Sequence, residues 1–592
     1  MSHQRLEARL AHHLAGLYPP ADAVRILPAL VSLGQTLASP PRVGTVDQHD
    51  VWLIAYPDHV SDSSPAPTLP ALRHVLNHEL AQVVNGVHLL PFYPWSSDDG
   101  FAVTDHDAVD PRYGTWEDVG VIAGSSRVMV DAVVNHVSAD HPWVREWADG
   151  RRDGWIMQVD DGFDTSRVMR PRTTPLATAF EGPDGQPRFA WTTFGPDQVD
   201  LDYRTPEVLL AMTRVLLGYA ARGADIIRLD AVAFLWKESG TTCVHLPQTH
   251  QLIRLWRTML DHFAPGTLLI TETNVPHRQN VSYFGDGRDE AHLVYQFPLA
   301  PLVLAAFNWG STQELVRWAA SLTPLASGTA FFNFLGSHDG IGLRPVEGMV
   351  APAQMDGLCN LAVAAGGGVS HRANPDGSQS PYELNTTFID ALAAIAEDDH
   401  GVARILAAHA ILLALQGVAG VWFGAMFGVT NDHELVGRTG RLRSINRGRV
   451  SAECLGEELT RPGTLAQVLW QSIGSLIRLR RASPAFAPDS PQQVLPTPGW
   501  LFAVVRGKPG GRVMVVVSVS DQDRAIVPAD LVGGGRWRDA LGDGAAAVLA
   551  GHDRLVLPPY GIAWLAEAEA RTPAARPWAV VRRSQSTGPG PS

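Results

Sequence analysis

The chain has 592 residues, of which 45% are hydrophobic and 18% are charged, and its formal net charge is −13 at pH 7. Because a single hydrophobic core stops growing at about 250–300 residues, this length predicts one large domain with smaller satellites. The excess of acidic residues argues against nucleic acid or an anionic membrane surface as the main partner, and it favours a small-molecule ligand.

The cysteines and the N-terminus bear on the compartment. Cys243, Cys359 and Cys454 lie far apart, without metal-ligand spacing, and their odd number argues against a disulfide framework. Residues 1–18 have an amphipathic helical pattern without the apolar core of a secretory signal, and no stretch is long and apolar enough to span a bilayer. We therefore expect a cytoplasmic protein. Its N-terminal helical extension, residues 1–48, either packs on the rest of the chain or forms a homodimer.

From about residue 50 onward, short apolar runs rich in β-branched residues alternate with amphipathic segments. This alternation predicts βα units and a parallel sheet. Eight candidate strands have this character, at residues 51–56, 86–90, 128–134, 225–229, 268–271, 292–297, 331–336 and 420–424. Eight such strands predict an α/β fold in which the sheet closes into a (β/α)8 TIM barrel.

Two connections between these strands are too long for ordinary loops. Residues 138–199 are rich in Arg, Pro, Gly and Trp and predict an inserted domain, whereas residues 340–400 predict a long active-site loop. After residue 487, short alternating strands with glycine-rich turns predict an antiparallel β domain. The remaining predicted segments are the barrel at residues 49–137 and 200–486, the C-terminal β domain at 487–570 and a flexible tail at 571–592.

Acidic side chains follow several of the predicted strands, at the end of a barrel where catalytic groups are found. Asp230, Glu272 and Asp339 follow the fourth, fifth and seventh strands, so we expect three carboxyl groups at one mouth. Cleavage of a glycosidic bond with retention needs two carboxyl groups about 5 Å apart, with different pKa values. Arg228 lies two residues before Asp230, on the same face of the strand, and is expected to keep Asp230 ionised. Asp230 is thus the better candidate for the nucleophile and Glu272 for the proton donor.

Two polar residues in the strands have simpler interpretations. Asp131 follows the pattern of a structural carboxylate or helix cap, and we expect it to be mainly structural. His88 lies inside an apolar strand and is expected to be a hydrogen-bonded core histidine. Asn135 is expected to make hydrogen bonds and not to bind calcium.

Four short motifs, in this order along the chain, resemble the signature regions of the α-amylase superfamily, glycoside hydrolase family thirteen. They are DAVVNH (131–136), RLDAV (228–232), TET (271–273) and SHD (337–339), and QVDLDY (198–203) resembles a fifth signature. The resemblance covers roughly residues 50–570 and implies a (β/α)8 barrel with an inserted domain B and a C-terminal β domain.

The same resemblance implies roles for individual residues. Asp230 would be the nucleophile and Glu272 the acid/base, while Asp339 would grip the 2- and 3-hydroxyls of the sugar. The residues that would hold the glucose in subsite −1 are Arg228, His136 and His338.

Longer segments resemble the sucrose phosphorylase subfamily, in which phosphate replaces water. They are residues 86–101, 230–243, 334–342 and 380–388. Arg172, in an Arg-Pro-Arg sequence, matches an arginine that helps to bind phosphate, and cations are needed to bring phosphate to a site with three carboxylates. By the same resemblance Arg443 lies near the −1 sugar, Phe101 is an aromatic platform and Asp98 binds the distal hydroxyls of glucose.

The chain departs from sucrose phosphorylases where the acceptor is expected to bind. Tyr382–Glu383 stands in place of their Tyr-Gln, and Phe234 in place of a tyrosine, which argues against a fructose acceptor. Several segments, including residues 245–250, 268–287 and 374–385, resemble glucosylglycerate phosphorylases of the same subfamily. A glycerate acceptor carries a carboxylate, and the candidate cations for it are Arg372, Lys237, His245 and Arg172.

The leading interpretation is therefore a retaining glycoside phosphorylase that reversibly converts 2-O-α-D-glucosyl-D-glycerate and inorganic phosphate, its co-substrate, to α-D-glucose 1-phosphate and D-glycerate by double displacement. It is expected to need no metal or other cofactor. Its expected partners are a small α-glucoside and phosphate. A sucrose phosphorylase or another α-glucoside phosphorylase, acting on glucosylglycerol or sucrose 6′-phosphate, would differ in the acceptor alone. An α-glucosidase or transglucosidase would use water or a sugar. A non-enzymatic scaffold should lack some of the three acids, which this chain keeps.

Overall fold

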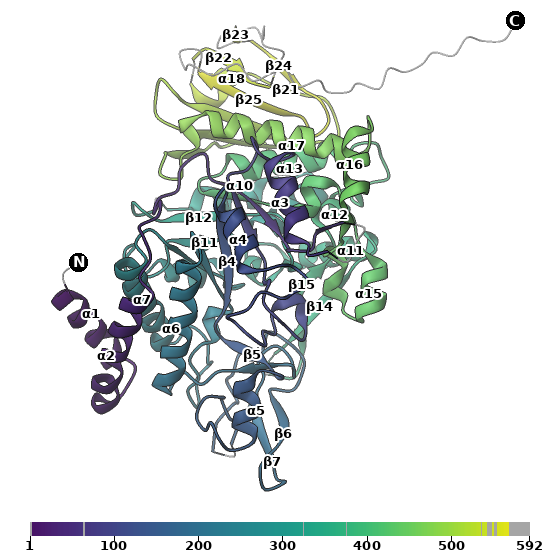
Figure 1. Cartoon of the computed structure of the whole chain (residues 1–592). Helices are drawn as coiled ribbons and strands as arrows, with labels where there is room; N and C mark the ends of the chain where they lie inside the picture. The colour runs from purple at the N-terminus through teal and green to yellow at the C-terminus, as the bar shows by residue number, and fades with distance from the viewer. Residues whose placement is uncertain are drawn as a thin grey trace, which may run out of the picture.

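The computed structural model describes residues 3–567, apart from residues 63–65, 161, 324, 375, 534, 542–547 and 550–552. The predicted tail at 571–592 lies outside the described residues. Figure 1 shows a central barrel with the C-terminal domain at one end, an inserted domain at the other, and two N-terminal helices against one side.

Eight parallel strands close into the predicted barrel, in the order β1-β16-β12-β11-β10-β9-β4-β3. The strands are β1 (Val51–Ala55), β3 (Gly86–Leu89), β4 (Arg127–Val133), β9 (Ile226–Asp230), β10 (Leu268–Thr271), β11 (Leu293–Tyr295), β12 (Ala330–Asn333) and β16 (Val418–Trp422). Pairing of β1 with both β3 and β16 closes the ring. All eight predicted strands are present. The last begins two residues earlier than expected, and it ends two residues earlier because residues from Phe423 onward form the short helix α14 (Phe423–Phe427).

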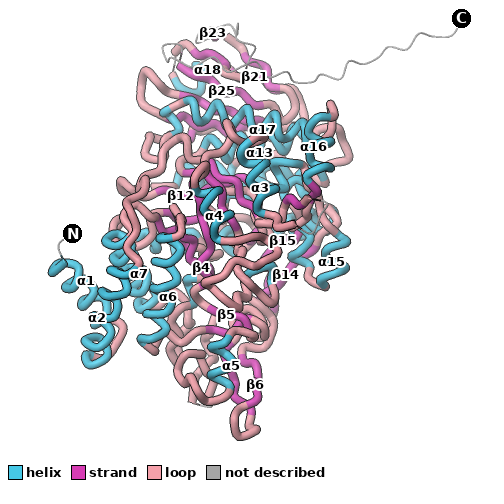
Figure 2. Tube along the Cα trace, viewed as in Figure 1, coloured by secondary structure: helices cyan, strands magenta, loops and turns pink. Residues whose placement is uncertain are grey.

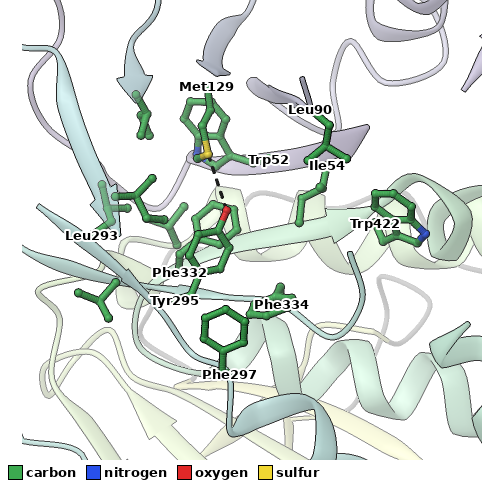
Figure 3. Close-up of a cluster of buried hydrophobic side chains, with 14 of the residues drawn as sticks. Trp52, Ile54, Leu90, Met129, Leu293, Tyr295, Phe297, Phe332, Phe334 and Trp422 are labelled. Atoms are coloured by element: carbon green, nitrogen blue, oxygen red, sulfur yellow. Dashed lines mark hydrogen bonds between the residues drawn. The ribbon is translucent and has the colours of Figure 1, made fainter. Parts of the chain in front are cut away.

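Aromatic side chains fill the inside of the barrel (Figure 3). Trp52 is fully buried, and a Cβ atom on Gly86 of the neighbouring strand would lie 2.6 Å from its ring. Phe332 lies against Gly420 in the same way, because a Cβ atom on Gly420 would lie 2.4 Å from the Phe332 ring. These two glycines are needed because no other residue leaves room for the rings that pack the barrel.

Amphipathic helices surround the strands and bury their apolar faces against them. They are α3 (Leu69–Asn77), α4 (Trp116–Ala123), α6 (Pro206–Ala221), α7 (Pro247–Phe263), α9 (Leu299–Trp309), α10 (Gln313–Ser321), α13 (Gly401–Ala414) and α17 (Leu465–Ala482). No helix among the described residues is long and apolar enough to cross a membrane.

The inserted domain follows β4 and is called domain B here. Its elements are β5 (His136–Ser138), α5 (Pro142–Ala148), β6 (Ala177–Glu181), β7 (Pro187–Trp191) and β8 (Gln198–Asp200). Much of it is loop, as Figure 2 shows. Antiparallel pairing of β5 with β8 brings His136 opposite Asp200 and returns the chain to the barrel mouth.

The long connection after β12 is an ordered structure with a small sheet. It contains β13 (Ile341–Gly342), α11 (Pro352–Ala364), β14 (Gly368–Ala373), β15 (Gln379–Asn385) and α12 (Phe388–Ala393). β15 lies between the other two strands, and Gly342 of β13 pairs with Glu383 of β15. This pairing places Tyr382 and Glu383 beside the end of β12, where the site is expected.

The N-terminal extension packs on the barrel. Helices α1 (His3–Ala15) and α2 (Pro20–Thr36) lie beside α7 and α6 (Figure 1), and His13 Nε2 lies 3.0 Å from Thr258 Oγ1 of α7. The Tyr18 hydroxyl donates to the Tyr203 carbonyl oxygen at 2.9 Å. Of the two roles left open for this extension, packing on the barrel is observed, and the homodimer stays a prediction.

The C-terminal domain is a six-stranded antiparallel sheet with a further two-stranded ribbon. The sheet has the order β18 (Gln492–Val494), β19 (Leu501–Arg506), β20 (Val513–Ser518), β25 (Ile562–Glu567), β22 (Trp537–Asp539) and β23 (Val548–Leu549), and the ribbon pairs β21 (Arg524–Ile526) with β24 (Leu555–Leu557). It covers α13 and α17 (Figure 1), and the buried Arg506 side chain donates to the Ala414 carbonyl oxygen of α13 at 3.1 Å.

Candidate active site

The carboxyl ends of the barrel strands, domain B and the connection 340–400 enclose one pocket. Every predicted site residue except Arg228 lines it. The lining residues are Asp98, Phe101, His136, Arg172, Phe194, Gln198, Asp230, Ala231, Glu272, Asn274, His338, Asp339, Tyr382, Glu383 and Arg443. Residues predicted from separate strands and loops are therefore brought together in space.

Arg228 forms the floor beneath this pocket. Its Nη1 donates to Asp131 Oδ1 at 2.5 Å and to Asp230 Oδ1 at 2.8 Å, and all three residues are buried. His88 Nε2 lies 2.7 Å from the second oxygen of Asp131, Oδ2. Both oxygens of Asp131 are thus engaged below the pocket, as expected of a structural carboxylate, and His88 is a hydrogen-bonded core histidine.

The contact with Arg228 lowers the pKa of Asp230 but, contrary to our expectation, does not bring it below the usual value. Burial raises the pKa of this carboxyl above its usual value, and the charge of Asp131 adds to the rise. Together these effects exceed the lowering by Arg228 and His136. The arginine therefore fixes the position of the Asp230 carboxyl group without giving it a low pKa.

Glu272 is the carboxyl group with the larger upward shift. Burial, with the negative charges of Asp230 and Asp339, raises the pKa of Glu272 to about 7, although Arg228 opposes the rise. Its Oε2 accepts a hydrogen bond at 3.0 Å from the backbone amide of Ala231, the residue after Asp230. Ala231 has a φ of 49°, a left-handed conformation that costs energy for a residue with a side chain. This turn links the two carboxyl groups and holds Glu272 beside Asp230.

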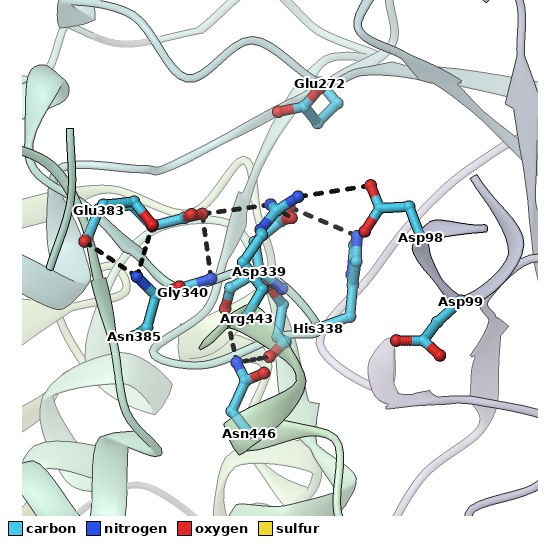
Figure 4. Close-up of polar contacts among 12 residues, drawn as sticks. Asp98, Asp99, Glu272, His338, Asp339, Gly340, Glu383, Asn385, Arg443 and Asn446 are labelled. Carbon is cyan, nitrogen blue, oxygen red and sulfur yellow. Dashed lines mark hydrogen bonds and ion pairs between the residues drawn. The ribbon is translucent and has the colours of Figure 1, made fainter. Parts of the chain in front are cut away.

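Asp339 lies against Arg443 (Figure 4), and this arginine helps to keep its carboxyl group charged. Its Oδ1 accepts from Arg443 Nη2, and its Oδ2 lies 3.4 Å from His338 Nε2. Burial alone would raise the pKa of Asp339, but its interactions with His338 and Arg443 hold it well below its usual range. Burial also lowers the pKa of His338 to about 3, so this histidine is neutral near pH 7 and Arg443 is the main counter-charge.

Asp98 lies on the other side of Arg443 from Asp339. Arg443 Nη1 lies 3.5 Å from Asp98 Oδ2, and Arg447 Nη1 lies 3.4 Å from Asp98 Oδ1. Although burial opposes the change, these two arginines lower the pKa of Asp98. Asp98 and Asp99 both have positive φ, near 50°. This strained turn precedes Phe101, whose ring stacks on His338 with centroids 4.6 Å apart.

Glu383 and Tyr382, from β15, form the wall next to Arg172. The buried Glu383 accepts at Oε1 from the Gly340 amide at 3.1 Å and from Arg443 Nη2 at 3.2 Å. The Arg172 guanidinium lies over the Tyr382 ring, 5.2 Å from its centroid. Burial raises the pKa of Tyr382 to about 12, although Arg172 opposes the rise, so the phenol stays protonated.

Of the four cations considered for an acceptor carboxylate, the structure brings Arg172 alone into the pocket lining. Arg372 Nη2 pairs with Glu347 Oε1 at 3.1 Å. The Nδ1 atom of His245 lies 2.7 Å from the Tyr283 hydroxyl, and His245 is not among the residues that line the pocket. Lys237, another of the four candidates, does not line the pocket and is buried in an ion pair with Asp200. Phe234 does not line the pocket either; its ring packs edge-on against Phe194, which does, with centroids 5.4 Å apart.

Lys237 joins domain B to the barrel. Its Nζ lies 2.7 Å from Asp200 Oδ2 and 3.0 Å from Asn135 Oδ1. Asp200 also accepts from the Thr193 amide and hydroxyl. The ammonium group thus occupies the position between Asn135 and a domain B carboxylate, and Asn135 makes hydrogen bonds there as expected.

Four residues of the site were missed at the sequence level. Gln198 opens the motif QVDLDY, Asn274 follows TET, and Arg447 ends RLRSINR, so three of them stand next to a motif that had been singled out. Their roles depend on contacts between segments far apart in sequence, such as the 3.2 Å contact of Gln198 Nε2 with His136 Nε2. Phe194 had no comparable signal.

The closed barrel, the domain B insertion after the third strand and the carboxyl groups at the barrel mouth define an α-amylase-type enzyme. A comparison with family models agrees, because the α-amylase catalytic domain matches residues 80–342.

Two curated relatives extend this match over most of the chain. A glucosylglycerate phosphorylase from Allomeiothermus silvanus is 42% identical over 567 residues, covering 95% of this chain and 98% of the relative. One from Escherichia coli is 45% identical over 449 residues, covering 75% of this chain and 80% of the relative. Among solved structures, sucrose 6F-phosphate phosphorylase from Thermoanaerobacter thermosaccharolyticum superposes with a TM-score of 0.70 and 25% identity, covering 80% of this chain and 95% of that one. The chain belongs to the α-amylase family, in the branch that contains the glucosylglycerate and sucrose phosphorylases.

Proposed function

We propose that the protein catalyses the reversible phosphorolysis of 2-O-α-D-glucosyl-D-glycerate to α-D-glucose 1-phosphate and D-glycerate, with retention at the anomeric carbon. The observation that carries this proposal is one pocket that holds two adjacent carboxyl groups of different pKa together with Arg172, a cation that makes no ion pair with any of the described residues. The similarity to glucosylglycerate phosphorylases over nearly the whole chain supports the choice of acceptor.

In the first half of the reaction the glycosidic bond breaks. The Asp230 carboxylate attacks the anomeric carbon and forms a β-glucosyl ester, while Glu272 gives its proton to the departing glycerate oxygen. A pKa of about 7 keeps about half of Glu272 protonated at neutral pH, where an ordinary glutamate would be almost fully ionised, and a proton donor requires this protonated form. Arg228 holds Asp230 in place for the attack through its 2.8 Å contact.

In the second half phosphate replaces glycerate. Glu272, now a carboxylate, accepts a proton from the incoming phosphate, whose oxygen attacks the anomeric carbon and releases Asp230. Phosphate must approach a pocket with three carboxyl groups, and Arg172 supplies a guanidinium able to pair with it. Asp230 and Glu272 are thereby restored to their starting protonation states.

The remaining pocket residues would hold the glucose in subsite −1. Asp339 is placed to bind the 2- and 3-hydroxyls, and Asp98 the distal hydroxyls, with Arg443 between the two carboxylates. The ring of Phe101 would stack on the sugar, and His136 and His338 would form hydrogen bonds with its hydroxyl groups. Each residue lines the pocket, which supports these roles.

The test compares α-glucosylglycerate, sucrose and α-glucosylglycerol as substrates, with and without phosphate. The expected result is phosphate-dependent release of α-glucose 1-phosphate from glucosylglycerate, with the α configuration shown by NMR. Release of free glucose at the same rate without phosphate would identify a hydrolase instead. A strong preference for sucrose or glucosylglycerol would keep the phosphorylase chemistry and overturn the acceptor.

We further infer a cytoplasmic location, since the three cysteines are unpaired in the structure.

A further inference from the structure

Arg344, in the connection 340–400, is a buried cation without an acidic partner. It is 7% exposed, and no carboxylate of the described residues lies within the 4.0 Å of an ion pair. Its one hydrogen-bond contact is from Nη1 to the sulfur of Met169, a weak acceptor. Burying a guanidinium in this way is costly, because the nearby negative charge of Glu347 lies beyond ion-pair distance and is already paired with Arg372.

Other cations around the pocket contrast with Arg344. Arg228 contacts two carboxylates and Arg443 three, while Lys237 contacts Asp200. Arg372, on the neighbouring strand β14, pairs with Glu347. Arg172, like Arg344, makes no ion pair among the described residues. Its guanidinium contacts the Tyr382 ring and donates to the Pro171 carbonyl oxygen at 3.4 Å.

Arg344 does not itself line the pocket, but it lies beside the lining residue Tyr382, with which it interacts electrostatically. The amide of Leu343 donates to the Tyr382 carbonyl oxygen at 2.9 Å, so Arg344 follows the strand β13 directly beside Tyr382. Met169, which Arg344 contacts, lies three residues before Arg172 in domain B. Arg344 and Arg172 therefore flank the Tyr382 segment from two different parts of the chain.

The same strand also faces the proposed proton donor. A Cβ atom on Gly342 would lie 2.5 Å from Asn274 Oδ1, so β13 packs closely on the residue two positions after Glu272. Asn274 Oδ1 is buried and has no hydrogen-bond partner among the described residues. His245 lies nearby as well: burial, reinforced by the charge of Arg344, lowers the pKa of His245 to about 4. The segment that carries Arg344 thus packs beside the residue two positions after Glu272, near the place where the acceptor oxygen must lie.

We propose that Arg344 and Arg172 together form the subsite for the carboxylate of the acceptor, and that Arg344 determines the preference for a small hydroxy acid over a neutral polyol. This inference rests on the proposed function and names residues for it. In the glucoside the carboxylate is bonded to the carbon that carries the glycosidic oxygen, so it must lie close to Glu272. Glycerate leaves before phosphate enters, so Arg172 can bind the carboxylate of glycerate first and phosphate afterwards. Arg344 binds the carboxylate of the acceptor.

The experiment uses α-glucose 1-phosphate as donor and compares D-glycerate with glycerol, which has a hydroxymethyl group in place of the carboxylate. Hydrogen bonds to charged groups contribute enough that the loss of kcat/KM in Arg344→Gln should be about 10- to 100-fold greater for D-glycerate than for glycerol. Most of the loss should be in KM for D-glycerate. Arg344→Lys should recover part of it, and melting temperatures of both variants establish that they fold.

Arg372→Gln is the matched control, because this arginine is near Arg344 but already paired with Glu347. It should leave KM for D-glycerate unchanged. Equal losses for both acceptors in Arg344→Gln, or an unchanged KM for D-glycerate, would overturn the subsite. The proposed function fails separately if the wild-type enzyme does not glucosylate D-glycerate. In that case the subsite is judged by competitive inhibition by D-glycerate, which should be present in the wild type and weakened in Arg344→Gln.

Discussion

Arg443 Nη2 lies 3.2 Å from Glu383 Oε1, and this ion pair explains how a buried carboxylate can border a site for anions. The same guanidinium contacts Asp339 and Asp98, so it counters three negative charges on the sugar side of the pocket. Glu383 is thereby directed away from the acceptor side, where Arg172 remains available. The cation that neutralises Glu383 is not one of the four considered from the sequence.

Replacing Glu383 tests the importance of this pair. Glu383→Gln keeps an oxygen to accept from Arg443 and from the Gly340 amide, so we expect kcat/KM for phosphorolysis to stay within about 10-fold of wild type. Glu383→Ala removes both contacts and leaves buried donors unpaired, which should lower kcat/KM by about 10- to 100-fold and reduce Tm. Initial rates and thermal melts measure both effects. Equal behaviour of the two variants would show that the contacts are unimportant.

Substitution of the two central carboxyl groups should separate their roles. Asp230→Asn should lower turnover of every donor by about 10,000-fold or more, because no glucosyl ester can form. Glu272→Gln should lower kcat/KM for glucosylglycerate by about 100- to 10,000-fold, since the departing glycerate alkoxide needs a proton. With α-glucose 1-phosphate the loss should be smaller, because phosphate leaves more readily without one.

Steady-state rates with the two donors measure this difference. Glucosyl-enzyme trapped by rapid acid quench and detected by mass spectrometry provides the control for Glu272→Gln. If Glu272→Gln lost activity equally on both donors, Glu272 would not be the proton donor.

The barrel and most of the pocket could be predicted because their signals are local in the sequence. A β-branched run followed by an acid, as in DIIRLD, specifies both a strand and the group at its end. Arg443 and Glu383 were predicted by resemblance to a family. Their ion pair was not, because it joins segments sixty residues apart that meet only when the connection 340–400 folds over the barrel mouth.

Burial explains the remaining failures. The sequence shows that Arg228 and Asp230 share a strand face, but the pKa of Asp230 depends on how completely water is excluded, which is a property of the whole fold. Lys237 appeared to be a free cation until Asp200 was placed against it by domain B. Arg344 stood in no recognised motif, and its lack of an acidic partner is visible only in three dimensions.

The raised pKa of Glu272 predicts a pH dependence of activity. The proton donor must be protonated, so kcat/KM for glucosylglycerate should fall as pH rises through about 7, the pKa of Glu272. This limb should be absent with Glu272→Gln, measured at the higher enzyme concentrations that its low activity requires. A wild-type profile that stays flat from pH 6 to pH 8, a range set by that pKa of about 7, would contradict the assignment.

The same shift predicts a pH dependence of stability, with a definite sign. The folded protein binds a proton at Glu272 more tightly than the unfolded chain, so the stabilising contribution is complete below the usual glutamate pKa and is lost as pH rises through about 7. Glu272→Gln carries no such group and should gain Tm relative to wild type at pH 8 more than at pH 5, on either side of that transition. Thermal melts at the two pH values, with Glu238→Gln as an exposed control, measure the difference. A larger gain at pH 5 would reverse the sign and contradict the raised pKa.

Lys237 should be important for stability because it joins domain B to the barrel through buried contacts. Its side chain is 2% exposed and that of its partner Asp200 is 0% exposed. Lys237→Met removes the ammonium group and leaves the Asp200 carboxylate buried against Thr193 and Asn135 without a cation, which should reduce the free energy of unfolding by about 3–5 kcal/mol. The double variant Lys237→Met/Asp200→Asn removes both charges and should recover much of that loss. Urea denaturation of the wild type, the single variant and the double variant measures the coupling. A single variant as stable as the wild type would show that Asp200 is satisfied by its hydrogen bonds alone, and that the lysine is not needed to hold domain B in place.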